Sequence, residues 1–109
     1  MKTSSAKAKG KKLQNKVRDK LLETFPQLEE NDVISQIMGA SGEDIVLSPA
    51  ARKLIPFSIE CKKHKSFSVY NHYDQAASQN KGEALVIIEA DRRKPLVLVD
   101  LDTFLTLLK

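Results

Sequence analysis

The segment that most constrains the fold of this chain runs from Ile55 to Lys62, where apolar and polar residues alternate in the order IPFSIECK. This two-residue period is typical of a half-buried strand, so the segment is predicted to be the central strand of a sheet. Side chains two positions apart on a strand point to the same face, which is expected to bring Glu60 and Lys62 together. A second carboxylate, Asp44, opens the apolar run IVL and is expected to lie on a neighbouring strand.

The length of 109 residues predicts a single domain over residues 1–109, with residues 1–6 as a flexible basic tail. Apolar residues at 41% and charged residues at 29% are ordinary for a soluble globular protein. No apolar run approaches the roughly 20 residues of a membrane span, and the N-terminus lacks the apolar centre of a signal peptide. We therefore expect no membrane partner. We expect the protein to be located in a cytoplasm, which is that of the host if the chain is phage-encoded.

Cys61 is the only cysteine, which excludes an intramolecular disulfide and a thiolate zinc cluster.

Positive charge is concentrated in particular segments of the chain. The net charge is +4, and basic residues crowd the first 20 positions, the segment around Lys63 and the segment RRK at 92–94. One interpretation is a set of contacts to nucleic-acid phosphates, and the other is an ordinary solvated tail with solvated loops. The residues expected to contact DNA under the first interpretation are Lys11, Lys12, Lys16, Lys63, Lys65, Arg92 and Arg93.

Periodicity and turn residues predict the remaining elements. A helix with Leu13, Val17 and Leu21 on one face is expected over 7–25, ending at Pro26. The other expected elements are strands over 33–38 and 44–47, a glycine turn over 39–44, at most one helical turn over 48–54, a helix over 68–79, strands covered on both faces over 84–88 and 96–99, and a last helix capped by Asp100. The order α-β-β-β-α-β-β-α predicts an α/β fold with a mixed central β-sheet flanked by helices.

The three charged residues suit the hydrolysis of a phosphodiester, which needs a positioned water and stabilisation of charge on the phosphate. Magnesium prefers oxygen ligands and keeps several of its waters, so Mg²⁺ or Mn²⁺ is the expected cofactor. Asp44 and Glu60 are the natural ligands, with the backbone carbonyl of Cys61 as a further one. Lys62 would orient the attacking water or neutralise charge on the phosphate.

With these residues the chain resembles the PD-(D/E)XK nuclease superfamily, in which an acidic residue opens one strand and Glu-x-Lys follows on the next. Asp44 in GEDIVL and Glu60 and Lys62 in SIECK match this motif, and Glu43 stands where proline is usual. The chain looks most like small phage and archaeal endonucleases of the Holliday junction resolvase type. The resemblance implies a restriction endonuclease-like core and a homodimer.

Two further positions come from the same resemblance. A glutamine on the helix after the lysine strand assists the site in those enzymes. Gln75 in NHYDQAASQN matches that position best, with Gln79 as the weaker candidate. They also carry an acidic residue on the first helix, where this chain has Gln14, with Glu23 as a weaker candidate. Glutamine at this position departs from the pattern.

Three functions remain open at this point. The first is a metal-dependent endonuclease that cuts duplex or branched DNA. The second is a non-catalytic basic α/β module that binds structured DNA or RNA. The third is an assembly protein that uses its two apolar strands at a subunit interface.

Overall fold

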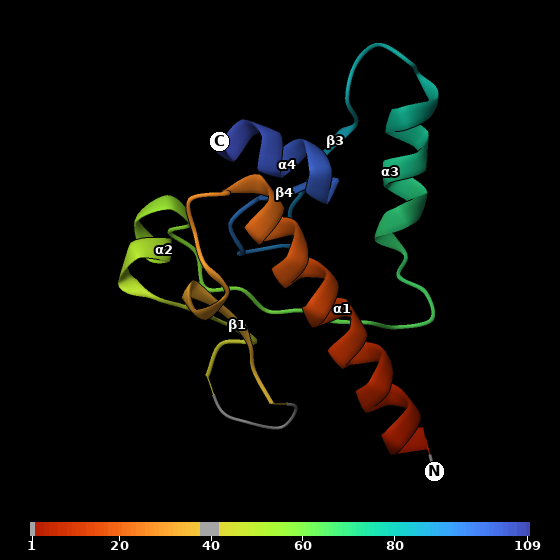
Figure 1. Ribbon diagram of the computed structural model, residues 1–109. Coiled ribbons are helices and arrows are strands. Elements are labelled where there is room, and N and C mark those ends of the chain that lie inside the picture. The colour runs from red at the N-terminus through yellow and green to blue at the C-terminus, as the bar shows by residue number, and fades with distance from the viewer. Residues whose placement is uncertain (1, 38–41) are drawn as a thin grey trace. The chain divides into compact units, whose positions relative to one another are not determined.

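The computed structural model describes the backbone of residues 2–37 and 42–109, and the side chains of residues 8–37 and 42–109. The described chain has a mixed α/β fold with four α-helices and two small antiparallel sheets (Figure 1). It divides into two compact units, Met1–His64 (unit 1) and Lys65–Lys109 (unit 2). The strands of the described residues lie in two separate two-stranded sheets rather than in the single central sheet predicted from the sequence, so the restriction endonuclease-like order is not confirmed.

Unit 1 contains helix α1 (Lys2–Thr24), a 3₁₀ turn η1 (Glu30–Asp32), strands β1 (Val33–Ser35) and β2 (Ile45–Leu47), and helix α2 (Pro49–Leu54). Residues 2–6, predicted to be a flexible tail, belong to α1. The helix ends just before Pro26, as the missing N–H and ring of proline require. Strands β1 and β2 pair antiparallel, with Val33 opposite Leu47 and Ser35 opposite Ile45. The glycine turn predicted over 39–44 lies partly outside the described residues.

The core of unit 1 forms between one face of α1 and the β1–β2 pair. Val17 and Leu21 on α1, and Phe25 directly after its last residue, recur every four residues and are buried. The other buried apolar residues of this unit are Leu28, Val33, Ile45, Leu47, Ala51 and Ile55. Helix α2 begins at an N-cap, because the Ser48 hydroxyl accepts the Ala51 N–H at 3.1 Å.

Residues 55–62 form no strand, so the prediction of a central strand here is wrong. A strand needs a ladder of backbone hydrogen bonds to a neighbouring strand. In this segment one residue has no N–H to donate, and two other backbone groups bind side chains instead. Pro56 lacks an N–H, the carbonyl of Phe57 accepts the Arg52 guanidinium, and the N–H of Cys61 donates to a carboxylate. One backbone bond, from the Asp44 N–H to the Ile59 carbonyl at 3.1 Å, still holds the segment beside the start of β2.

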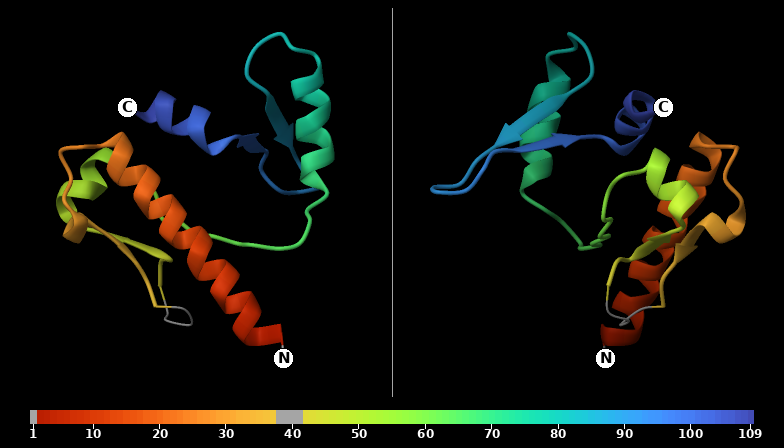
Figure 2. Two further views of the ribbon diagram at one scale, coloured as in Figure 1. Left: turned by 45° about the vertical axis from the view of Figure 1, so that its right-hand side comes forward. Right: turned by 90° about the vertical axis from the view of Figure 1, so that its left-hand side faces the viewer.

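Unit 2 contains helix α3 (Val69–Ser78), strands β3 (Leu85–Ile88) and β4 (Leu96–Val99), and helix α4 (Leu101–Leu108). The strands form an antiparallel hairpin that pairs Leu85 with Val99 and Ile87 with Val97, and α3 lies against β3 (Figure 2). Asn80 follows α3 with a φ of 52°, the left-handed conformation that commonly ends helices. Asp100 caps α4 as predicted, since its carboxylate accepts the Thr103 N–H at 2.8 Å.

One face of the β3–β4 hairpin is exposed. Leu85, Ile87 and Val97 point to this face and are 52%, 63% and 63% exposed, so the prediction that both strands are covered on both faces is wrong. A two-stranded sheet covered by α3 leaves its second face open, whereas the predicted central sheet would have buried it. Across residues 2–37 and 42–109, no helix has the length and apolar character needed to cross a membrane.

Candidate active site

Asp44 immediately precedes β2, and three hydrogen bonds fix its backbone. Its N–H donates to the Ile59 carbonyl at 3.1 Å, and its carbonyl accepts both the Gln36 N–H and Nε2 of Gln14, each at 2.9 Å. The partners come from the 55–62 segment, from the residue after β1 and from α1. The backbone position of this carboxylate is therefore set by three separate parts of unit 1.

The carboxylate of Asp44 is directed toward the Glu60–Lys62 segment. Its Oδ2 atom accepts the backbone N–H of Cys61 at 2.6 Å. Hydrogen bonds to an ionised acceptor are shorter and stronger than neutral ones, and this bond is slightly shorter than the usual N–H···O range of about 2.7–3.2 Å. The contact places the first acid of the predicted motif beside the residue that separates Glu60 from Lys62.

Glu60 and Lys62 form an ion pair, with Lys62 Nζ 2.9 Å from Glu60 Oε2. They share a side as predicted, although the backbone between them is irregular. The hydrogen bond and charge of Glu60 raise the pKa of Lys62, and the charge of Asp44 adds to this effect. The ammonium thus lies in the field of both carboxylates. Both side chains are 66% exposed, and an exposed ion pair of this kind adds little to stability, so a phosphate or cation could displace it at little cost.

Cys61 is half-buried between the two acids. Burial raises the pKa of its thiol, and the charges of Asp44 and Glu60 raise it further. A thiol with a raised pKa is protonated at neutral pH and is a poor nucleophile. The group that this residue can offer to the site is therefore its backbone and not its sulfur.

A second ion pair holds the segment that precedes β2 to the 55–62 segment. The two Nη atoms of Arg52 contact the two carboxylate oxygens of Glu43 at 2.8 and 3.0 Å, and Nη1 also donates to the Phe57 carbonyl at 2.7 Å. The hydrogen bonds from Arg52, followed by that from Ser58, lower the pKa of Glu43. The acid that replaces the usual proline of the motif thus connects the two segments that carry Asp44 and Glu60. No local pattern in the sequence indicates this role of Glu43 and Arg52.

Helix α1 presents a row of donors to the same region. Lys11, Gln14 and Arg18 lie three and four residues apart, the spacing of one helix face. Nζ of Lys11 donates to the Ser35 and Gln36 carbonyls at 3.2 and 2.9 Å, and Nε of Arg18 donates to the Val33 carbonyl at 2.7 Å. These bonds tie the helix to β1 and to the residue after it. The signal in the sequence was the helical spacing of three polar residues interleaved with the buried apolar ones.

Gln14 is the buried member of this row, with 3% of its surface exposed. Its Nε2 atom lies within hydrogen-bonding distance of Ser35 Oγ (3.4 Å), the Gln36 carbonyl (3.2 Å) and the Asp44 carbonyl (2.9 Å). The side-chain amide faces acceptors with its donor end, which a carboxylate could not do. Gln14 therefore holds the backbone of Asp44 in place by donating a hydrogen bond to its carbonyl. The weaker candidate, Glu23, is exposed near the other end of the helix.

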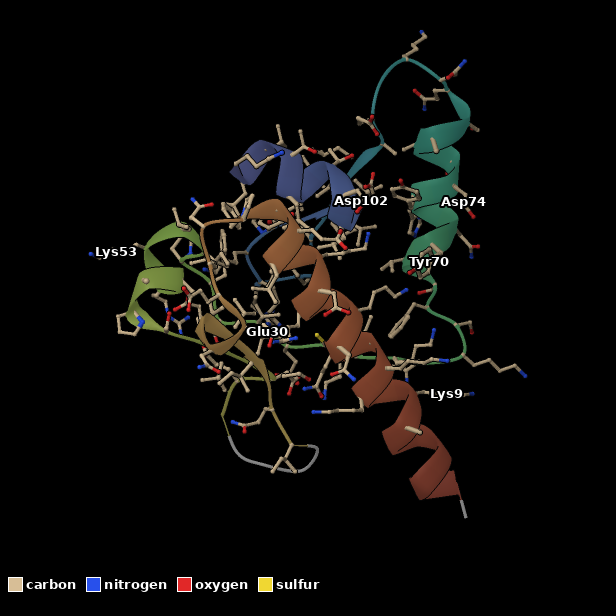
Figure 3. The ribbon with its side chains drawn as sticks, viewed as in Figure 1. Lys9, Glu30, Lys53, Tyr70, Asp74 and Asp102 are labelled. Carbon is tan, nitrogen blue, oxygen red and sulfur yellow. The ribbon has the colours of Figure 1, made fainter. Side chains whose placement is uncertain are left out.

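The residues predicted to contact DNA differ in what surrounds them. Lys12, Lys16 and Lys63 are exposed in unit 1, whereas the ammonium of Lys11 is engaged with β1. In Figure 3 the side chains of Lys9 and Lys53 also point away from their helices. Lys65, Arg92 and Arg93 are exposed in unit 2, and so is Gln75 on α3. Of the 18 basic residues, 12 belong to unit 1 with 8 of the 14 acids, while unit 2 has six of each, so the positive charge of +4 resides in unit 1.

The donor atoms near Asp44 suit a hard divalent cation. Over the part of the chain that the structure describes, no three His, Cys, Asp or Glu side chains are grouped so that they could hold a metal. Magnesium does not need three, because it is commonly held by one or two carboxylates and retains several waters. Asp44 has Oδ1 in addition to the oxygen that accepts the Cys61 N–H, and Glu60 has Oε1 in addition to the oxygen that pairs with Lys62. The chemistry of this donor set fits Mg²⁺ or Mn²⁺.

Comparisons of the chain with models of protein families, with curated proteins and with solved structures found no match. What this site can do chemically therefore follows from its own residues.

Proposed function

We propose that the protein is a divalent-metal-dependent DNA endonuclease that hydrolyses phosphodiester bonds, in the manner of the PD-(D/E)XK nucleases and of the Holliday junction resolvase type among them. The observation that carries the proposal is the hydrogen bond between the Asp44 carboxylate and the Cys61 N–H, which joins the two halves of the motif. The proposal includes a restriction endonuclease-like core, action in a cytoplasm, and duplex or branched DNA as substrate.

Asp44, Glu60 and the backbone carbonyl of Cys61 would hold the cofactor, Mg²⁺ or Mn²⁺. When bound, such an ion supplies a water of lowered pKa and neutralises charge on the phosphate oxygens. The protein's own contribution would be to hold the Asp44 carboxylate beside the segment that carries Glu60. The hydrogen bonds from Gln14 and Gln36 to the Asp44 backbone supply that restraint.

Lys62 would act on the phosphate as a cation. The pKa of its ammonium is raised by Glu60 and Asp44, so it carries its proton at neutral pH and is not a general base. Its ion pair with Glu60 is exposed and readily exchanged. When Glu60 engages another cation, the ammonium of Lys62 becomes available to a phosphate oxygen or to a hydrogen bond that orients water. Gln75 is proposed as an assisting residue on the resemblance alone.

The surface of unit 1 supports a contact with the DNA backbone. Lys12, Lys16 and Lys63 are exposed there, and Lys65, Arg92 and Arg93 of unit 2 are proposed as additional contacts. Contacts of this kind give affinity with little reading of sequence. Binding that depends on them weakens steeply as salt rises, because each contact releases condensed counterions.

A homodimer is part of the proposal, with the exposed face of the β3–β4 hairpin as the surface that a second copy covers. Leu85, Ile87 and Val97 form cross-strand neighbours on this face.

The nuclease proposal is tested by digestion of plasmid DNA and of a four-way junction, with Mg²⁺, with Mn²⁺ and with chelator. The wild type is expected to cut only when a divalent ion is present, and Glu60→Gln is expected to be inactive. Glu30→Gln, which removes an exposed acid elsewhere in unit 1, is the matched control and should cut normally. Cleavage that persists unchanged in Glu60→Gln, or that no divalent ion elicits from the wild type, would overturn the proposal.

The second candidate is a binding module without catalysis. It is favoured by one observation, that Glu60 and Lys62 satisfy each other as an ion pair without any ligand. Under this alternative the same DNA is bound with strong salt dependence, but it is not cut. A gel-shift series run beside the digestions separates the two, because retained binding with no cleavage in any divalent ion supports the module.

A further inference from the structure

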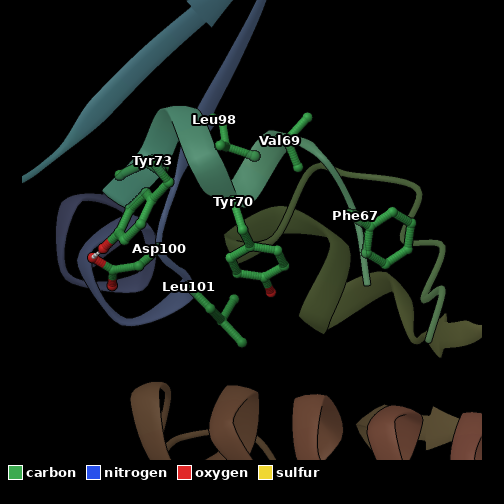
Figure 4. Close-up of a pocket in the computed structure, with 8 residues that line it drawn as sticks. Phe67, Val69, Tyr70, Tyr73, Leu98, Asp100 and Leu101 are labelled. Carbon is green, nitrogen blue, oxygen red and sulfur yellow. Dashed lines mark hydrogen bonds between the residues drawn. The ribbon is translucent and has the colours of Figure 1, made fainter. Parts of the chain in front are cut away.

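Unit 2 contains a pocket that the nuclease proposal does not use. It has a volume of about 440 Å³ and lies between the start of α3 and the junction of β4 with α4 (Figure 4). Its walls include three aromatic rings, those of Phe67, Tyr70 and Tyr73. The volume is within the range of roughly 300–1,000 Å³ that sites for small molecules occupy.

The remaining walls of the pocket are aliphatic, apart from one charged group. Val69, Leu98 and Leu101 contribute carbon surface, and the charge belongs to Asp100. In Figure 4 the carboxylate of Asp100 lies beside the ring of Tyr73, with Tyr70 and Leu101 next to them. An apolar pocket with a single charged group selects its ligand mainly by the sign of that charge.

The charge of Asp100 is not neutralised by the groups that it contacts. Its carboxylate accepts the Thr103 N–H at 2.8 Å, the Thr103 hydroxyl at 2.9 Å and the Tyr73 hydroxyl at 3.3 Å, all of which are neutral donors. The bond from the Thr103 backbone, followed by that from its hydroxyl, lowers the pKa of Asp100. The carboxylate is therefore ionised at neutral pH.

Aromatic faces and a carboxylate attract the same kind of ligand. The face of an aromatic ring carries negative potential and attracts cations, most effectively where water is excluded. A phosphate or carboxylate would be repelled by Asp100, which disfavours a nucleotide. A small inorganic cation would need more oxygen ligands than one carboxylate and two phenols provide. An ammonium that carries methyl groups meets both requirements, because it is cationic and presents carbon to the aliphatic walls.

We propose that this pocket binds a small organic cation of the methylated ammonium class, with Phe67, Tyr70 and Tyr73 contacting its methyl groups and Asp100 balancing its charge. This binding activity goes beyond the proposed cleavage of DNA and does not depend on it. Tyr70 is 61% exposed, so its ring has surface available to a ligand.

The test is a calorimetric titration of the full-length protein with choline and with 3,3-dimethyl-1-butanol, a neutral molecule of the same shape. Choline is expected to bind at least roughly tenfold more tightly, because only the cation gains from the rings and the carboxylate. Equal affinity for the two probes, or no heat of binding from either, would overturn the proposal. Binding to phosphatidylcholine vesicles without binding to free choline would also overturn it.

Three variants connect binding to the pocket. Asp100→Asn removes the charge and keeps the helix cap, because asparagine is as good an N-cap as aspartate. The affinity for choline should fall roughly tenfold, and the affinity for 3,3-dimethyl-1-butanol should not change. Tyr70→Leu should weaken choline in the same way, and the exposure of this side chain makes a folding defect unexpected. Asp102→Asn removes a neighbouring charge that does not line the pocket and should bind choline normally. Choline affinity that is unchanged in both Asp100→Asn and Tyr70→Leu would show that the site lies elsewhere.

Discussion

The backbone N–H of Cys61 lies 2.6 Å from Oδ2 of Asp44, although the two residues are 17 positions apart in the chain. The contact joins the residue that opens β2 to the segment that carries Glu60 and Lys62. Asp44 therefore has a structural partner as well as a proposed role in metal binding. Substitutions that keep or remove the acceptor atom can separate the two.

Asp44→Asn keeps an oxygen acceptor for the Cys61 N–H and removes the charge, whereas Asp44→Ala removes both. We expect Asp44→Asn to change the free energy of unfolding by less than about 1 kcal/mol, and Asp44→Ala to lower it by about 1.5–3 kcal/mol because a charge-assisted hydrogen bond is lost. Both should abolish DNA cleavage. Urea unfolding followed by circular dichroism measures the first effect, and a digestion assay measures the second. Full activity in Asp44→Asn would mean that the carboxylate has only the structural role.

Gln14 is predicted to act through its donor end. Gln14→Ala leaves the acceptors at Ser35, Gln36 and Asp44 without this partner and should lower the free energy of unfolding by about 1–3 kcal/mol. Gln14→Glu places a buried carboxylate against carbonyl oxygens, which raises its pKa in the folded state. A raised folded pKa means that stability is retained at low pH and lost as pH rises through that pKa.

Urea unfolding of Gln14→Glu should therefore show a larger deficit relative to the wild type at pH 7.5 than at pH 5, both measured with chelator present. Gln14→Ala is the control, because its deficit has no reason to change over this interval. A Gln14→Glu protein that is as stable as the wild type at pH 7.5 would contradict the role of this side chain as a hydrogen-bond donor to the carbonyls of Gln36 and Asp44.

The Glu43–Arg52 ion pair predicts a dependence of stability on acid. The pKa of Glu43 is lowered below its ordinary value of 4.5, so its contribution is present above that value and is lost as pH falls through the folded pKa. The melting temperature of the wild type should fall as the buffer is taken from pH 6 to pH 3. In Glu43→Gln the melting temperature should decrease less over the same pH interval. Part of the decrease should persist, because the pKa values of Asp32 and Asp100 are also lowered. Identical melting curves for the two proteins at every pH would exclude a contribution from this pair.

The exposed hairpin face predicts the association state. Sedimentation velocity should detect a dimer of the wild type that Ile87→Lys converts to a monomer, because the substitution places a charge on the apolar face. Thr106→Lys changes an exposed residue of α4 and should leave the dimer intact. A wild type that sediments as a monomer at every concentration up to about 100 μM would remove this surface from the proposal.

The sequence predicted most helices correctly because their signals are local. The apolar spacing of Leu13, Val17 and Leu21 predicted α1, and Asp100 marked the start of α4. The strands over 84–88 and 96–99 were also located, but their burial was not, since burial depends on which layers cover a strand. The segment 55–62 has the alternation of a strand, and its backbone groups are instead taken by Arg52 and Asp44, partners that no local pattern reveals.

The candidate site was predictable to a similar extent. The residue types of Asp44, Glu60 and Lys62 pointed to a motif, and the structure brings the two segments into contact. Gln14 was considered only as a replaced acid, because its donors matter only once the carbonyls of Gln36 and Asp44 are placed beside it. The role of Glu43 depends in the same way on Arg52, which approaches it through the fold of α2 onto β2.

The central claim is that Asp44 and Glu60 hold one divalent ion, and Mn²⁺ binding measured by electron paramagnetic resonance tests it most directly. The full-length wild type is predicted to bind Mn²⁺ and to release it to excess Mg²⁺. Asp44→Asn and Glu60→Gln should each bind at least roughly tenfold more weakly, and Glu30→Gln should bind as the wild type does. The same binding curve for all four proteins would contradict the claim.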